Sequence, residues 1–244
     1  MKCVAVFIDI HSHLLPGIDD GAKDTETSME MFRIAHKNGI THMILTPHHK
    51  PMRHNASPPR IAEMITRARE MLDEEGIDIQ LYAGNEIYYH SDAANVLEEG
   101  RACTMAGSQY VLTEFGPMDD FDYIRNGIYQ IMAGGFRPIL AHAERYQCIT
   151  SKPERVEELV RMGCYIQLNA GSITGAYGFG TKQFTKKILK QRLAHFIATD
   201  AHDIDKRAPQ LAECSKYVSR KFGEEYERVL LYENPMHIIN NEYI

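Results

Sequence analysis

Long hydrophobic runs are missing from this 244-residue sequence. No stretch reaches the roughly 18 apolar residues that a membrane-spanning helix requires, so we expect no membrane insertion. The apolar start of the chain is also too short for a signal peptide. Cysteines are few: the five are never closely spaced, which argues against a disulfide framework or a zinc knuckle. Their odd number fits a reducing compartment, and we expect a cytoplasmic protein.

A block of basic residues is also absent, and the formal net charge is -6. That balance argues against nucleic acid as the main partner. An acidic chain can still bind an anionic substrate where metal ions supply the positive charge. Linkers, low-complexity segments and internal repeats are lacking as well. The length is sufficient for one large core, and we predict a single domain over residues 1–244.

Short apolar runs alternate with longer amphipathic stretches. The runs predict strands near residues 4–10, 43–45, 79–83, 110–112, 139–141, 165–168 and 196–198. The stretches predict helices near residues 24–38, 59–75, 92–99, 121–133, 151–163, 181–192, 208–222 and 225–232. Strands that alternate with helices imply right-handed crossovers and a parallel sheet. Seven such strands predict an α/β barrel related to the eight-stranded (β/α) barrel.

The segment Ile8-Asp9-Ile10-His11-Ser12-His13 places two histidines at the end of the first predicted strand. Side chains alternate along a strand, so His-x-His puts both imidazoles on one face, where they can bind one metal ion. Asp19 and Asp20 follow a few residues later. Taken alone, the two histidines could also be ordinary loop residues.

Side chains that can bind metals follow six of the seven predicted strands. All strand C-termini of a parallel barrel meet at one mouth, which carries the active site. These residues should therefore converge: His11, His13, His48, Glu86, Glu114, His142, Asp200 and His202. Each alone could be structural, but with an aspartate of the Asp19-Asp20 pair they number nine, more than one ion needs. A set without cysteine argues against structural zinc, and two or three ions could activate water and hold substrate oxygens.

Six motifs carry a resemblance to the PHP (polymerase and histidinol phosphatase) superfamily. They are Ile8-Asp9-Ile10-His11-Ser12-His13, Asp19-Asp20-Gly21, Thr46-Pro47-His48-His49, Glu86-Ile87-Tyr88-Tyr89, Ala141-His142-Ala143-Glu144-Arg145-Tyr146 and Thr199-Asp200-Ala201-His202. Within the superfamily, the chain most resembles the bacterial manganese-dependent tyrosine-protein phosphatases of capsule and exopolysaccharide clusters. The resemblance covers nearly the whole chain and implies a distorted (β/α)7 TIM-like barrel, the PHP fold, with a three-ion site at its mouth.

The resemblance also implies roles for individual residues. The first ion would be held by His11, His13, Glu86 and Asp200. Glu86 would bridge to a second ion, which Glu114 and His142 would also hold. The third ion would be held by Asp20, His48 and His202. Asp20 is chosen over Asp19 because it directly precedes the glycine, as in the family motif.

The predicted catalytic residues are Arg145, Arg207 and Asp20. The two arginines would contact phosphate oxygens through their guanidinium forks; the alternative for each is an ordinary surface arginine. The activity implied by the resemblance is hydrolysis of phosphotyrosine on the tyrosine-rich tail of a membrane-associated bacterial tyrosine kinase. That reaction would regulate capsular or exopolysaccharide synthesis. Tyr88 and Tyr89 could line the mouth for such a tail or could simply pack in the core.

Alternatives remain open at this stage. Mn²⁺ is the metal that the resemblance implies, but ligand types do not separate it from Fe or Zn. The protein could instead be a PHP phosphoesterase for a small substrate, such as histidinol phosphate or a nucleotide. It could also be a catalytically weak PHP domain that acts as a binding module. All expected ligand positions are filled, which argues against the last alternative.

Two features of the chain fall outside this pattern. Cys214 and Arg220 match the Cys-x5-Arg spacing of cysteine-dependent tyrosine phosphatases. That chemistry needs a loop whose backbone N–H groups surround the phosphate. The intervening residues contain no glycine and lie in a predicted helix, so we interpret the match as coincidence. The other feature is an N-terminal extension relative to the family, Met1 to Val6, which we expect to lengthen the first strand.

Overall fold

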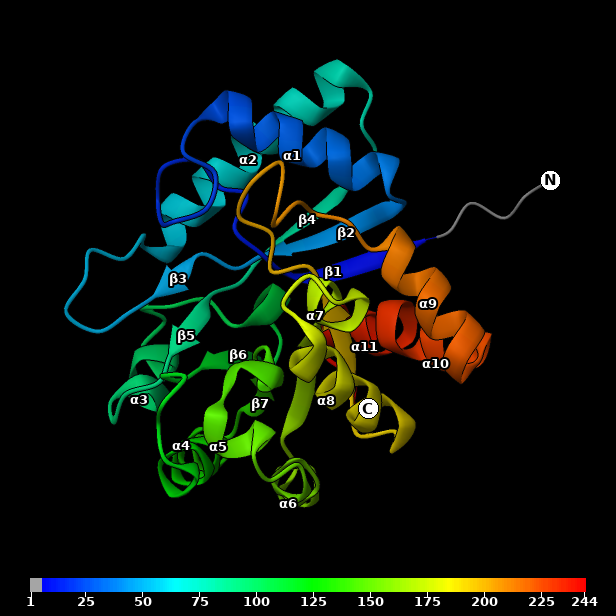
Figure 1. The fold of residues 1–244 in the computed structure, drawn as a ribbon. Helices are drawn as coiled ribbons and strands as arrows, with labels where there is room; N and C mark the ends of the chain where they lie inside the picture. The colour runs from blue at the N-terminus through cyan, green and yellow to red at the C-terminus, as the bar shows by residue number, and fades with distance from the viewer. Residues whose placement is uncertain (1–5) are drawn as a thin grey trace.

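The strands of the computed structural model, which describes residues 6–244, all pair in parallel (Figure 1). One sheet contains β1 (Phe7–Ser12), β2 (Ile40–Leu45) and β4 (Gln80–Ala83). The other contains β3 (His48–His49), β5 (Glu86–Tyr88), β6 (Tyr110–Glu114), β7 (Arg137–Leu140), β8 (Tyr165–Asn169) and β9 (Phe196–Ala198). The predicted start of the first strand, at residues 4 and 5, lies outside the described residues.

These elements correspond to seven strands, two of which are interrupted. Thr46-Pro47 separates β2 from β3, and Gly84-Asn85 separates β4 from β5. The interrupted strands still pair with each other on both sides of the breaks. The ring closes between β1 and β9, where Ser12 bridges to Ala201 and the Asp200 N–H donates to the His11 carbonyl over 2.8 Å. The predicted distorted (β/α)7 barrel is confirmed.

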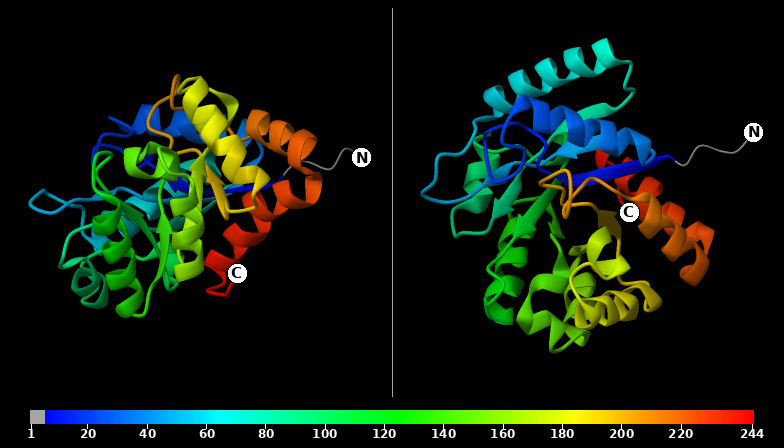
Figure 2. Two further views of the ribbon diagram at one scale, coloured as in Figure 1. Left: turned by 60° about the horizontal axis from the view of Figure 1, so that its bottom comes forward. Right: turned by 45° about the horizontal axis from the view of Figure 1, so that its top comes forward.

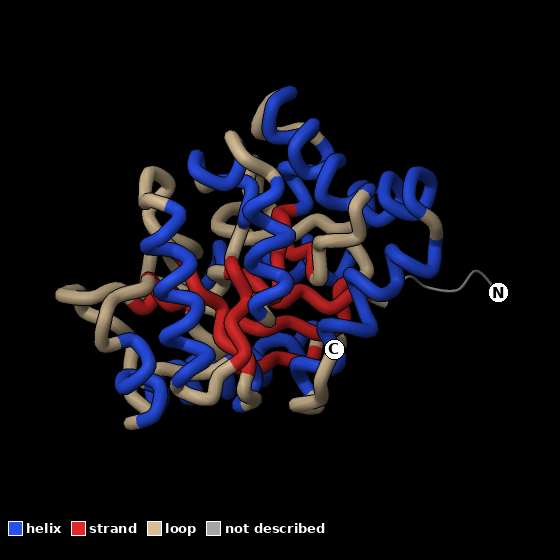
Figure 3. The backbone as a smooth tube through the Cα atoms, turned by 90° about the horizontal axis from the view of Figure 1, so that it is seen from below, coloured by secondary structure: helices blue, strands red, loops and turns tan. Residues whose placement is uncertain are grey.

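Helices cover the outside of the strands, as Figures 2 and 3 show. The predicted ones are α1 (Thr25–Lys37), α2 (Pro58–Glu75), α3 (Ala93–Glu98), α4 (Phe121–Ala133), α6 (Glu154–Met162), α8 (Phe179–Lys190), α9 (Ala212–Phe222) and α10 (Glu224–Arg228). Asp24 caps α1, because its side chain accepts from the Thr27 N–H over 2.8 Å. No helix within residues 6–244 has both the length and the apolar character needed to cross a membrane.

The remaining helical segments are short, and of these only the π-helical turn at Val229–Glu233, which continues α10, falls within a predicted helix, the one near residues 225–232. They are α5 (Gln147–Thr150), α7 (Ala170–Thr174), α11 (Asn234–Ile239), single 3₁₀ turns at Met105–Gly107 and Ala143–Arg145, and a π-helical turn at Val229–Glu233. Ile238 of α11 packs into a cluster of barrel residues that includes Ile8, Tyr110 and Phe196. This apolar cluster occupies the amino-terminal end of the barrel, since Tyr110 and Phe196 are the first residues of their strands. The predicted metal ligands lie at the opposite, carboxyl-terminal end.

Candidate metal centre

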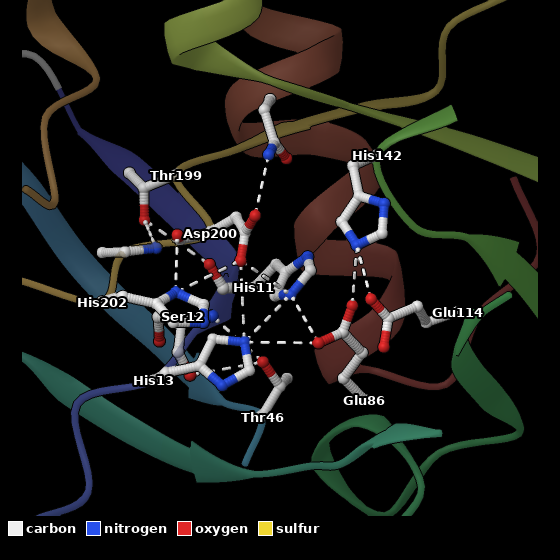
Figure 4. A network of polar contacts seen from close by, with 12 residues as sticks. His11, Ser12, His13, Thr46, Glu86, Glu114, His142, Thr199, Asp200 and His202 are labelled. Carbon is white, nitrogen blue, oxygen red and sulfur yellow. Dashed lines mark hydrogen bonds and ion pairs between the residues drawn. The ribbon is translucent and has the colours of Figure 1, made fainter. Parts of the chain in front are cut away.

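The nine predicted ligands meet at the carboxyl ends of the strands, and Figure 4 shows seven of them around one point. Their ligand atoms form four overlapping groups in which all atoms lie within 4.8 Å of one another. The groups are His13, Asp20, His48 and His202; His11, His142 and Asp200; His11, His13 and Glu86; and His48, Glu86 and Glu114. Each predicted ligand belongs to at least one group. The structure therefore brings the whole set together, and its binding of metal remains a prediction.

The first predicted ion site has the spacing of ligands around a single cation. The Nε2 atoms of His11 and His13 are 3.2 Å apart, and each lies 3.4 Å from Oε2 of Glu86. The same two nitrogens lie 3.4 and 3.6 Å from Oδ1 of Asp200. Four ligand atoms at about 2.1 Å from a central ion in a tetrahedron would be roughly 3.4 Å apart. The five distances that involve a histidine are therefore close to the spacing expected around one ion.

The hydrogen bonds behind the two imidazoles fix their tautomers. Nδ1 of His13 lies 2.7 Å from a carboxylate oxygen of Asp19, and Nδ1 of His11 lies 3.1 Å from the amide oxygen of Gln167. Because these oxygens only accept, each Nδ1 carries the proton and each Nε2 presents a lone pair. Two lone pairs thus face each other and the carboxylate oxygens of Glu86 and Asp200, and Nδ1 of His48 also lies 2.9 Å from Oε2 of Glu86. Such an arrangement requires a cation, either a proton or a metal ion.

The pKa shifts show how strongly the site attracts positive charge. Burial would lower the pKa of His13, but the hydrogen bonds to Asp19 and Glu86 outweigh it and raise this pKa to about 9. Burial is likewise outweighed at His48, where Asp20 and Glu86 raise the pKa to about 10. Metal ions compete with these protons, since ligation needs the neutral imidazole.

The second predicted ion site is built on Glu86, and the third on Asp20 of the loop after β1. Oε1 of Glu86 lies 2.9 Å from Nε2 of His142, while Oε2 faces the first site. A carboxylate divided in this way can bridge two ions. Oδ1 of Asp20 lies 3.2 Å from Nε2 of His48 and 3.5 Å from Nε2 of His202. The structure places His13 with Asp20, His48 and His202, and places His48 with Glu86 and Glu114, so the division of the ligands among three ions stays a prediction.

The carboxylate of Glu114 gives independent support for a bound cation. Its Oε2 is buried without a hydrogen-bond partner anywhere in residues 6–244. Burial, together with the neighbouring carboxylate of Glu86, raises the pKa of Glu114 to about 7. A buried acceptor without a partner costs roughly 1–3 kcal/mol. A cation bound by this carboxylate would remove that cost; Oε1 lies 3.6 Å from Nε2 of His142, and Oε2 lies 3.7 Å from Nδ1 of His48.

Both predicted catalytic arginines reach the centre. Nη2 of Arg145 and Nη2 of Arg207 lie 2.5 and 2.8 Å from the same oxygen, Oδ2 of Asp200. Arg145 ends the 3₁₀ turn after β7, and Arg207 lies in the connection from β9 to α9. Burial would raise the pKa of Asp200, but His11 and Arg145 hold it well below its usual value. Neither arginine is an ordinary surface residue, and their contact with phosphate stays a prediction.

The strand without a predicted ligand, β8, supplies two residues that the sequence analysis missed. The amide oxygen of Gln167 accepts from His11 Nδ1 and from the backbone N–H of His142 over 3.1 and 2.8 Å. Its Nε2 donates to Asn169, which donates in turn to Oδ2 of Asp200 over 2.9 Å. These two buried amides therefore orient three predicted ligands. Two amides at alternate positions of an otherwise apolar strand were the available signal.

Asp9 and Thr199 form a second supporting contact. The Thr199 hydroxyl and backbone N–H both donate to the Asp9 carboxylate, over 2.5 and 3.0 Å. Burial raises the pKa of Asp9 to about 6 despite these hydrogen bonds. The contact joins β1 to the end of β9, next to His11 and Asp200. A charged residue inside an apolar strand was the sequence signal for it.

The loop that carries Asp19 and Asp20 is held close to His13. Asp19 accepts from the backbone N–H groups of Gly21 and His48 over 3.0 and 3.1 Å. A Cβ at Gly21 would lie 2.0 Å from the carbonyl oxygen of His13, so only glycine allows this approach. Asp19 supports His13 while Asp20 faces His48 and His202, in agreement with the choice of Asp20 as the ligand.

The remaining predicted features have structural roles. Tyr89 is buried and packs against the rings of Phe115 and Tyr123, with centroids 5.0 and 5.4 Å away. Of the two interpretations for this tyrosine, core packing is correct. Cys214 is buried inside α9, and burial raises the pKa of its thiol. No phosphate-binding loop surrounds Cys214, which confirms that the Cys-x5-Arg match is coincidental.

Comparisons with known proteins identify the family of this chain. A family model described as capsular polysaccharide synthesis, CpsB/CapC, matches residues 7–240. The tyrosine-protein phosphatase CpsB of Streptococcus pneumoniae is 33% identical over 97% of this chain and 100% of its own length. The tyrosine-protein phosphatase YwqE of Bacillus subtilis is 32% identical over 97% of this chain and 93% of its own length.

A solved structure gives the same result. It is one of the crystal structures of YwqE from Bacillus subtilis and CpsB from Streptococcus pneumoniae, which are described as unique metal-dependent tyrosine phosphatases. It aligns with 97% of this chain and 96% of its own, with a TM-score of 0.92 and 31% identity. On the family match and these full-length similarities, the chain belongs to the CpsB/CapC family of capsular polysaccharide synthesis proteins.

Proposed function

We propose that this protein is a metal-dependent protein-tyrosine phosphatase of one domain, residues 1–244, that acts in capsular or exopolysaccharide synthesis. The observation that carries the proposal is the close approach of His11, His13, Glu86 and Asp200: the two Nε2 atoms lie 3.2 Å apart and within 3.6 Å of an oxygen of each carboxylate. Two guanidinium groups stand beside that set. Membership of a family whose members are named tyrosine-protein phosphatases gives the substrate class.

The donor set fits two or three ions of a hydrolytic metal. Following the resemblance, we assign the first ion to His11, His13, Glu86 and Asp200, the second to Glu86, Glu114 and His142, and the third to Asp20, His48 and His202. Mn²⁺ is the proposed metal; Fe and Zn have similar ligand preferences, because all three accept imidazole and carboxylate. Bound ions supply positive charge at the phosphoryl oxygens and lower the pKa of bound water.

The chain's own residues bind and orient the phosphate ester. Arg145 and Arg207 point two Nη2 groups at one oxygen of Asp200, so they can turn to phosphoryl oxygens that arrive beside it. Their fixed positive charge stabilises the negative charge that phosphoryl transfer develops. Asp19, Gln167 and Asn169 hold the ligand side chains in place, so that they do not reorganise during the reaction.

The proposed substrate is phosphotyrosine on the flexible tail of a membrane-associated bacterial tyrosine kinase. A flexible tail suits a site at the open mouth of a barrel, and the capsule connection comes from the names of the family and its members. We propose a cytoplasmic location, next to such a kinase. The four cysteines within the described part of the chain are all free, which fits a reducing compartment.

The test measures phosphate release by metal-stripped protein, with and without Mn²⁺, beside a His11→Ala variant. We expect Mn²⁺-dependent hydrolysis of a phosphotyrosyl peptide that the variant loses. Histidinol phosphate and a nucleoside monophosphate serve as competing substrates. Faster turnover of either small ester would refute the proposed substrate class, and full activity of His11→Ala would refute the metal centre.

A further inference from the structure

A cavity of about 340 Å³ adjoins the proposed metal centre at Asp20 and His48. The remainder of its lining comes mainly from the loop between β3 and α2, through Lys50, Arg53 and His54. This loop extends away from the barrel in Figures 1 and 2. The volume falls within the roughly 300–1,000 Å³ of ordinary ligand pockets. Because Asp20 and His48 belong to both, the cavity and the metal centre are continuous.

The loop has a closed base. The Lys50 N–H donates to Oδ1 of Asn55, and Nδ2 of Asn55 donates back to the Lys50 carbonyl, each over 2.8 Å. Pro51 restricts the backbone just inside this pair of hydrogen bonds. Residues 51–54 therefore form a short tip on a fixed base, and Arg53 is presented from that tip into the cavity lining.

The lysine and the arginine of this loop, Lys50 and Arg53, are not paired with acidic residues of the described part of the chain. Neither Lys50 nor Arg53 forms an ion pair within 4.0 Å of a carboxylate in residues 6–244, whereas several exposed arginines elsewhere do. Arg33 pairs with Glu75, Arg101 with Asp92 and Arg161 with Glu157. The acidic residues of the cavity, Asp19 and Asp20, are engaged by the site's histidines. Two unpaired cations thus face a cavity beside the centre, in a chain of net charge -6.

We propose that this cavity is a subsite for an anionic side chain that flanks the phosphotyrosine. The inference rests on the proposed phosphatase function and narrows its substrate class to phosphopeptides with an acidic residue beside the phosphotyrosine. A peptide whose phosphotyrosine enters the centre lies with its neighbouring residues over the loop, since adjacent residues of an extended chain are only about 3.3–3.6 Å apart. A small phosphoester without such a neighbour presents no anionic side chain to Arg53.

The experiment compares phosphotyrosyl peptides of equal length on the Mn²⁺-loaded protein. Two glutamates, two glutamines or two lysines flank the phosphotyrosine, placed before it in one series and after it in another. An exposed ion pair contributes up to about 1 kcal/mol, which is about fivefold in kcat/KM. In one of the two series we expect kcat/KM to be about fivefold higher with glutamate than with glutamine, and lower still with lysine. In 1 M salt, where the Debye length is about 3 Å, the three values should become equal.

Substitutions of single residues test whether Arg53 causes the preference for acidic peptides. Arg53→Ala should remove most of the preference, and Arg53→Glu should reverse it, while hydrolysis of p-nitrophenyl phosphate stays within about twofold of the wild-type rate. Arg220→Ala, which removes the same charge from the last turn of α9, is the matched control and should keep the preference. Equal rates on all peptides would overturn the subsite and leave the phosphatase function standing. Hydrolysis of p-nitrophenyl phosphate without cleavage of any peptide would instead refute the proposed function, and the subsite with it.

Discussion

Gln167 offers the sharpest test of how the metal centre is held, because it contacts three parts of the site without being a proposed ligand. Its amide oxygen accepts from His11 Nδ1 and from the His142 backbone, and its Nε2 donates to Asn169. The side chain is fully buried, so water cannot replace these partners. Leucine has a similar shape and none of the three hydrogen bonds.

The expected effect of Gln167→Leu on stability follows from those three contacts. Each buried group left without a partner costs roughly 1–3 kcal/mol, and the three losses share one location, so we expect about 3–6 kcal/mol in total. The expected effect on metal binding is separate. Loss of the partner that fixes the ring of a ligating histidine typically weakens metal binding by about 10- to 100-fold. Because Gln167 fixes the ring of His11, we expect Gln167→Leu to weaken Mn²⁺ binding by this factor.

Two measurements distinguish these effects. Urea unfolding of the metal-stripped protein gives the free energy of unfolding, and calorimetric titration with Mn²⁺ gives the dissociation constant. Thr185→Val is the control, since it removes a buried hydrogen bond to the Lys182 carbonyl in α8, away from the centre. It should lower stability slightly and leave Mn²⁺ binding unchanged. A destabilised Gln167→Leu protein that binds Mn²⁺ with wild-type affinity would refute the orienting role of Gln167.

Three other changes test separate parts of the argument. Gly21→Ala should weaken Mn²⁺ binding at least about tenfold in the same titration, because the new Cβ would lie 2.0 Å from the His13 carbonyl oxygen and displace the Asp19-Asp20 turn. Arg145→Lys should lower kcat/KM on a phosphotyrosyl peptide about 100-fold with Mn²⁺ binding little changed, since an ammonium group cannot reproduce the guanidinium fork; wild-type kinetics would exclude Arg145 from catalysis. Burial lowers the pKa of His195 to about 4, below the ordinary value of about 6.5, so the unfolded chain binds more protons between these values. Stability should therefore fall by up to about 3 kcal/mol as the pH drops from 6.5 to 4, and His195→Gln should flatten this dependence in urea unfolding.

The barrel could be predicted because its signal is local and repeated. Each strand is a short apolar run, and each long helix has an apolar stripe and an end signal, such as Asp24 before α1 or Gly76 after α2. The segments that were missed have no such signal. Helices of four to six residues, such as α7 and α11, do not form on their own and depend on the surfaces against which they pack. Ile238 of α11 is stabilised by the barrel cluster, which the sequence does not show.

The convergence of the nine predicted ligands could also be inferred, because topology alone brings all strand ends to one mouth. The partners behind the ligands could not. The Asp9–Thr199 contact spans 190 residues and the His11–Gln167 contact spans 156. Both depend on the register of particular strands, and a shift of one residue would turn each side chain to the opposite face. The ligands could therefore be predicted from their residue types and positions in the sequence. The residues that orient them can be identified only from the folded structure.

The two ends of the barrel explain how one chain can hold so many acceptors in one place. At the amino-terminal end, apolar side chains such as Ile8, Phe196 and Ile238 pack together. At the carboxyl-terminal end, the unpaired Oε2 of Glu114 and the facing Nε2 atoms of His11 and His13 cost free energy until a cation arrives. The apolar end offsets that cost, so the mouth can keep a preformed geometry. A preformed site loses no free energy to reorganisation when ions and phosphate bind, which is the condition for strong electrostatic stabilisation of a phosphoryl group.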